Sequence, residues 1–177
     1  MQGEKALRFF CFFILLAVLV GALKLINWLP LAIEKGTLRK YAGIEELRAH
    51  FPHEKIYLPS YFPRNLAWPP AKIVAQRKPS TAITMYFSEQ DTGKVGMTIQ
   101  QLGTGAGRPP SSALRVVKPL RESQVLIRDR AGTLVAALCE EEAPCHQLSW
   151  REGNFTLILT ATVPQRELIR MAASMLP

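Results

Sequence analysis

An apolar run near the N-terminus constrains this chain more than any other feature of its sequence. Residues 9–23 read FFCFFILLAVLVGAL and contain no charged residue. Lys24 follows, and the apolar stretch then continues to Leu29. A helix over residues 6–29 would be about 36 Å long, enough to cross the hydrocarbon core of a bilayer. The sequence therefore predicts a short N-terminal tail and a transmembrane anchor over residues 1–33.

The residues around this run suit a membrane–water interface. Arg8 and Lys24 have long side chains that can reach lipid headgroups, and Trp28 suits the aromatic belt of membrane proteins. A cleaved signal peptide is the alternative, because residues 1–8 form a basic start and residues 20–22 (VGA) resemble a cleavage site. Cleavage would leave an unexplained apolar stretch around Trp28 on the mature chain.

The charge distribution indicates which partners to expect. The formal net charge is +8, and half of this excess lies in the first forty residues, which contain six basic and two acidic side chains. Basic residues beside an apolar run favour anionic lipid headgroups. The chain has no helix-turn-helix, zinc-finger or aromatic-basic RNA-binding pattern. We therefore expect the membrane lipid bilayer as a partner, and no nucleic acid.

The direction of the anchor does not follow from charge, because basic residues stand on both sides of the apolar run. Two other features favour a domain outside the cytoplasm: the start of the chain has the form of a signal sequence, and the domain contains a cysteine pair suited to a disulfide. The expected location is thus a bacterial inner membrane, crossed once, with the C-terminal domain in the periplasm.

Behind the anchor, the sequence predicts a connecting helix over residues 34–53. Residues 37–51 carry apolar side chains at three- and four-residue spacing, including Ile44, Leu47 and Phe51, and Pro52 ends the pattern.

The rest of the chain, residues 54–177, is predicted to form one extracytoplasmic α+β domain. Alternation of apolar and polar residues predicts a mainly antiparallel sheet. A C-terminal helix follows, with Thr162 as its cap and an apolar stripe of Leu168, Met171, Ala172 and Met175. The expected strands cover residues 72–78, 82–88, 95–102, 124–129, 132–139, 146–151 and 155–162.

Residues 56–70 (IYLPSYFPRNLAWPP) contain four prolines and four aromatic residues. Prolines at this density block both a helix and a central strand. The segment is expected to be extended, with its rings packed on the domain. The alternative is a partner surface formed by Tyr57, Tyr61, Phe62 and Trp68.

Cys139 and Cys145 bracket a short acidic loop between two predicted strands, so a disulfide between them is expected. With His146, the same cysteines offer an alternative as a haem attachment or metal site, although c-type haem attachment normally needs Cys-x2-Cys-His and zinc usually needs four ligands. No nucleophile or metalloprotease motif is present. The sequence thus predicts no catalytic residues, no metal and no cofactor.

Four short segments of the domain carry a resemblance to a known family: residues 56–63 (IYLPSYFP), 97–101 (MTIQQ), 148–150 with 154–159 (LSW and NFTLIL) and 167–175 (ELIRMAASM). They resemble a poorly characterised bacterial domain found at the extracytoplasmic end of membrane-anchored, anti-sigma-factor-like proteins and some lipoproteins. The resemblance covers residues 44–176 and implies an α+β fold with a sensing or binding role outside the cytoplasm. Anti-sigma proteins hold their sigma factor with a cytoplasmic domain, and only about eight residues of this chain precede the apolar run.

These features together favour a non-catalytic, single-pass envelope protein that binds another protein, as an accessory subunit of a membrane complex. The alternative is a sensor or regulator of envelope stress that binds a small ligand or peptide. A redox or haem protein using Cys139, Cys145 and His146 is a third hypothesis.

Overall fold

The computed structural model describes residues 14–15, 18–21, 23–24, 38–106 and 114–176. It divides into two compact units, Met1–Leu38 and Arg39–Pro177.

In the first unit, the described residues 14–15, 18–21 and 23–24 are helical. Most of the predicted anchor, including Arg8 and Trp28, lies outside the described residues. Lys24 is described and exposed. Within the described part of the chain, no helix has the length and apolar character needed to cross a membrane.

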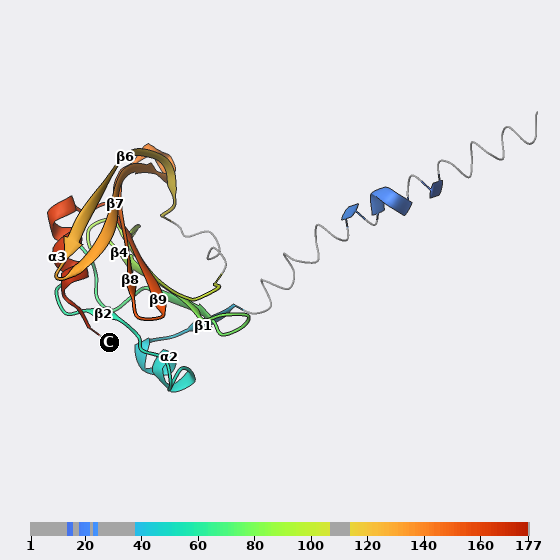
Figure 1. The fold of residues 1–177 in the computed structure, drawn as a ribbon, viewed down its shortest axis with the longest axis horizontal. Helices are drawn as coiled ribbons and strands as arrows, with labels where there is room; N and C mark the ends of the chain where they lie inside the picture. The colour runs from blue at the N-terminus through green and yellow to red at the C-terminus, as the bar shows by residue number, and fades with distance from the viewer. Residues whose placement is uncertain (1–13, 16–17, 22, 25–37, 107–113, 177) are drawn as a thin grey trace, which may run out of the picture. The chain divides into compact units, whose positions relative to one another are not determined.

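The second unit is built on one eight-stranded antiparallel sheet with the strand order β1-β3-β4-β5-β9-β8-β7-β6 (Figure 1). This arrangement confirms the predicted antiparallel sheet with flanking helices. Two short strands, β2 and β10, form a separate pair. The strands are β1 (Arg39–Tyr41), β2 (Leu58–Pro59), β3 (Lys72–Gln76), β4 (Ala82–Ser88), β5 (Val95–Gly103), β6 (Val116–Ile127), β7 (Arg130–Cys139), β8 (Pro144–Glu152), β9 (Phe155–Ala161) and β10 (Met175–Leu176).

The two faces of the sheet bury different kinds of side chain. Because successive residues of a strand point to opposite faces, β5 places Met97 and Ile99 on one face and Thr98 and Gln100 on the other. The first face carries the main apolar core. The second carries buried polar residues and a smaller apolar cluster around Cys139 and Cys145.

The segment predicted as a connecting helix contains a strand as well as a helix. Residues 39–41 form β1, which pairs with β3 in the sheet, and α2 (Ile44–His50) begins only after Gly43. The prediction of a continuous helix from residue 37 is therefore wrong. Pairing with β3 outweighs the local helical pattern, because tertiary contacts override weak propensities. Both elements belong to the compact unit that begins at Arg39.

The C-terminal helix α3 (Gln165–Ala173) forms where the sequence predicts it, and Leu168, Met171 and Ala172 of its predicted stripe are buried. Met175 is also buried, but it lies in β10, after the helix ends. The predicted cap of α3 is wrong. The N-cap position is Pro164, with no side-chain cap hydrogen bond, and Thr162 Oγ1 instead lies 2.9 Å from Glu89 Oε1. Thr162 thus connects the β9–α3 junction to the end of β4.

The proline-aromatic segment packs along the domain as an extended stretch. Gln101, buried on β5, anchors its start: its Oε1 accepts a 3.1 Å hydrogen bond from the Tyr57 N–H, and its Nε2 donates to the Lys55 carbonyl. Further along, β2 pairs with β10, and Ser174 Oγ accepts a 3.0 Å hydrogen bond from the Tyr61 N–H. The segment is therefore fixed at both the sheet and the end of α3.

A short 3-10 turn, η1 (Glu140–Glu142), connects β7 to β8. All three glutamates are exposed to solvent. The turn brings Cys139 and Cys145 together, with their Cα atoms 5.8 Å apart and their sulfur atoms bonded. The predicted disulfide is confirmed.

Candidate functional site

The outer strand β6 is the strongest candidate for a binding surface. It is the longest strand of the sheet, and it pairs with β7 on one side. Among the described residues, no other strand lies along its outer side. Figure 1 shows β6 and β7 as a long curved ribbon at the end of the sheet. A free strand edge presents backbone N–H and C=O groups that another chain can pair with.

The two halves of β6 differ in their suitability for pairing. The first half is interrupted by register shifts between Val116 and Lys118 and between Pro119 and Arg121. A proline, a lysine and bulges are devices that protect sheet edges from pairing. Residues 121–127 then run in unbroken register with β7. The pairing-competent edge is therefore confined to these seven residues.

Side chains on one face hold this part of β6 in place. Val125 and Ile127 pack on the main core. Opposite Val125, Gly132 allows a close approach, because a Cβ there would lie 2.8 Å from Ile127 Cδ1 and 3.2 Å from the Ser149 carbonyl oxygen. After the turn that follows β6, an ion pair between Arg130 and Glu152 connects the start of β7 to the end of β8. The free edge thus belongs to a packed hairpin.

The exposed side chains of β6 are both apolar and basic. Three of its large apolar side chains are exposed: Val117 (66%), Leu120 (59%) and Leu126 (69%). Residues 115–130 contain five basic and two acidic side chains, a net charge of +3. Residues 41–177 as a whole carry 16 basic and 12 acidic side chains, a net charge of +4. Most of the domain's positive excess is thus concentrated on this strand and its turn.

The four aromatic residues proposed as a partner surface do not form one exposed patch. Tyr57 is buried, and Tyr61 and Phe62 are half-buried. Trp68 is 51% exposed, while its ring stacks on Phe87 with centroids 6.0 Å apart. Their main role is packing on the domain, and Trp68 keeps one accessible face.

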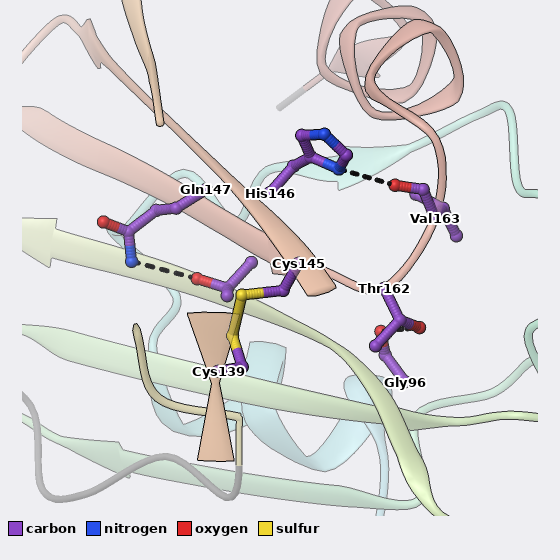
Figure 2. Close-up of a disulfide and its surroundings, with 8 residues drawn as sticks. Gly96, Cys139, Cys145, His146, Gln147, Thr162 and Val163 are labelled. Carbon is purple, nitrogen blue, oxygen red and sulfur yellow. Dashed lines mark hydrogen bonds between the residues drawn. A yellow bond between two sulfur atoms is a disulfide. The ribbon is translucent and has the colours of Figure 1, made fainter. Parts of the chain in front are cut away.

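The disulfide and His146 point to opposite faces of β8, as Figure 2 shows. Cys139 and Cys145 are buried in the smaller apolar cluster. The His146 ring lies on the other side, with Nδ1 3.1 Å from the carbonyl oxygen of Val163, so Nδ1 carries the proton that is donated. Because the two sulfur atoms are bonded to each other, neither can form a thioether bond to haem or bind a metal as a thiolate. Among the described residues, no group of three His, Cys, Asp or Glu side chains is arranged to hold a metal ion.

The sequence predicted only the end of the candidate edge, residues 124–129. The earlier part of β6 could have been recognised from alternating apolar and polar residues in VVKPLRESQVLI. The two bulges interrupt this alternation, so the pattern is hard to detect in the sequence. Comparisons with protein-family models, with curated proteins and with solved structures find no match to this chain. The resemblance to the anti-sigma-factor-like domain remains a prediction.

Proposed function

We propose that this chain is a non-catalytic, membrane-anchored protein of the bacterial envelope that binds an extended segment of another protein along β6. The observation that carries the proposal is the free edge of residues 121–127, which runs in regular register beside exposed apolar and basic side chains. An added strand would satisfy the outer backbone groups of β6, and its side chains would give specificity.

The chemistry of β6 indicates what this segment should contain. Arg121 and Arg128 flank the free edge, so acidic residues are favoured in the partner. Leu126 is exposed beside the edge, so an apolar residue is favoured at the facing position. The partner is therefore an acidic strand with apolar residues at alternate positions.

The membrane anchor and the periplasmic location are proposed mainly from the sequence. The uncharged run over residues 9–23 supports a single membrane span, and the disulfide between Cys139 and Cys145 supports an oxidising compartment such as the periplasm. An anchor beside a small binding domain fits an accessory subunit of a membrane complex. The resemblance described above supports a binding role outside the cytoplasm.

Selection from a library of random twelve-residue peptides, with the full chain in detergent micelles, tests the proposal. We expect selected peptides to combine acidic residues with alternating apolar ones, and to slow amide hydrogen exchange in residues 121–127. Leu126→Lys and Arg121→Glu should each weaken binding at least tenfold. The matched control Arg64→Glu, at an exposed arginine outside β6, should leave binding unchanged.

Two results would overturn the proposal. Peptides that protect the Trp68 region instead of β6 would move the site to the aromatic surface. Binding of β6 to vesicles of anionic lipid, without any selected peptide, would assign its apolar and basic side chains to a membrane surface.

A further inference from the structure

A polar hollow lies where β4 begins and β5 ends. In the strand order of the sheet, β9, β8 and β7 separate β5 from β6. The volume of the hollow is about 380 Å³, in the range of small-ligand sites. It is lined by residues from five separate parts of the chain: Glu54, Arg77, 79–81, 103–104 and 154–155. None of these residues belongs to β6.

Opposite charges line this hollow without neutralising each other. Glu54 and Arg77 are both described, and no ion pair joins them. Each is held by other groups. Glu54 Oε1 accepts a 3.1 Å hydrogen bond from Thr81 Oγ1. Arg77 donates to the carbonyl of His50, and its guanidinium carbon lies 5.1 Å from the centroid of the Phe51 ring.

These contacts leave hydrogen-bonding capacity on both charged groups. A guanidinium has five N–H donors, and one from Arg77 goes to His50. A carboxylate accepts several hydrogen bonds, and one to Glu54 comes from Thr81. Because both side chains are already positioned, a ligand that binds them loses little entropy in ordering the site.

Hydrogen bonds connect the separate parts of the chain that line the hollow. The Gly103 N–H donates a 2.7 Å hydrogen bond to the Thr81 carbonyl, and a Cβ at position 103 would lie 3.1 Å from that same oxygen. Thr104 Oγ1 donates to the Asn154 carbonyl over 3.1 Å. Glycine thus permits the close approach of the β4 and β5 ends.

From this arrangement we infer that the hollow binds a small zwitterion, a free amino acid or a short peptide. Its carboxylate pairs with Arg77, and its ammonium pairs with Glu54. A ligand with only one charge would leave one of the two side chains without its counter-charge. The inference is independent of peptide binding at β6, because the two sets of residues do not overlap.

Titration of the full chain in micelles with dialanine tests this site, followed by calorimetry and by amide NMR shifts. The second and third probes are N-acetyl-dialanine, which lacks the ammonium, and dialanine amide, which lacks the carboxylate. Glycine and alanyl-phenylalanine distinguish a free amino acid from a longer or larger ligand. We expect saturable shifts at Gly103, Thr104 and Asn154, and at least tenfold weaker binding when either charge is capped.

Two variants connect each charge of the ligand to one residue. Glu54→Gln should weaken dialanine binding at least tenfold while leaving N-acetyl-dialanine unaffected. Arg77→Gln should also weaken dialanine binding at least tenfold, and it should leave the binding of dialanine amide unaffected. Lys78→Gln, which removes an exposed neighbouring cation outside the hollow, is the matched control and should bind as the parent does.

Melting temperatures of the variants separate loss of binding from loss of folding. Equal affinity for capped and uncapped dialanine would overturn the inference, as would the absence of saturable shifts with dialanine, glycine and alanyl-phenylalanine alike. Neither result would affect the proposal for β6, whose peptide selection and exchange measurements report on other residues.

Discussion

Thr98 on β5 lies directly opposite Thr160 on β9, and both side chains are buried, yet their hydroxyl groups differ in hydrogen bonding. Thr160 Oγ1 accepts a 3.1 Å hydrogen bond from Gln147 Nε2. For Thr98 Oγ1, no partner is found within the described chain. Two equivalent side chains on one face of the sheet therefore have opposite contributions to stability.

Replacing Thr98 with valine should raise the free energy of unfolding by about 1 kcal/mol, because a buried hydroxyl without a partner is exchanged for a methyl group of similar size. Valine also suits a strand. Urea denaturation of the two proteins measures the difference.

Thr160→Val is the matched control, and it should lower the free energy of unfolding by about 1–2 kcal/mol because the Gln147 amide loses its acceptor. A loss of stability in Thr98→Val would contradict the assignment, and would indicate an ordered water at the Thr98 hydroxyl.

Removal of the disulfide should have a limited effect on stability. The two cysteines are six residues apart, so the bond closes a short loop and removes little entropy from the unfolded chain. We expect the double variant Cys139→Ala and Cys145→Ala to lose about 2 kcal/mol. A reducing agent should lower the melting temperature of the parent but not of the variant. Reductant sensitivity that persists in the variant would contradict this pairing.

The sequence predicted the central strands well because their periodicity is strong. In β4, Ile83, Met85 and Phe87 alternate with Thr84 and Tyr86, and the strand has the predicted limits. Each of these strands lies between two others, so burial of one face requires an alternating pattern. The stripe of α3 was predictable for the same reason, with a helical period.

The edges of the sheet were harder to predict. β1 has three residues, and its conformation depends on β3, which lies more than thirty residues further along the chain. In β6, Pro119 and two bulges break the alternation over half of the strand. The polar hollow was not predictable at all, since it brings Glu54 near Arg77 and Asn154 only after the sheet has formed.

The cluster around Trp68 offers a test of how much an exposed ring contributes. Phe87 is fully buried, with its centroid 5.0 Å from that of Phe62 and 6.0 Å from that of Trp68. Phe87→Ala should therefore cost about 3–5 kcal/mol. Trp68→Ala should cost about 1–2 kcal/mol, because about half of this residue is already in solvent and only its two ring contacts, with Phe62 and Phe87, are lost.

Urea denaturation followed by far-UV circular dichroism compares the two variants. Similar losses for Phe87→Ala and Trp68→Ala would show that the tryptophan contributes as much as a core residue. In that case its exposed face would not be free for a partner without a large effect on the fold.

Tyr61 should give the domain a distinctive response to alkaline pH. Its hydroxyl donates a hydrogen bond to Glu167 on α3, and the Arg170 guanidinium lies over its ring, 3.9 Å from the centroid. The hydrogen bond to Glu167, followed by desolvation and the charge of Glu167, raises the pKa of Tyr61 above 10.0, and the effect of Arg170 opposes this only in part. The folded state therefore favours the protonated phenol.

The sign of the pH dependence follows from linkage. A group whose pKa is higher in the folded state contributes stability that is fully present below its unfolded pKa and is lost as the pH rises through its folded pKa. For Tyr61 this loss begins near pH 10. In Tyr61→Phe the loss of stability at alkaline pH should be smaller than in the parent, because the titrating phenol is absent. In Glu167→Gln the loss should also be smaller, because the main cause of the raised pKa of Tyr61 is removed. Urea denaturation of thiol-blocked protein at pH 8 and at pH 11 measures the loss of unfolding free energy between these two pH values. An equal loss in the parent and in Tyr61→Phe would contradict the prediction.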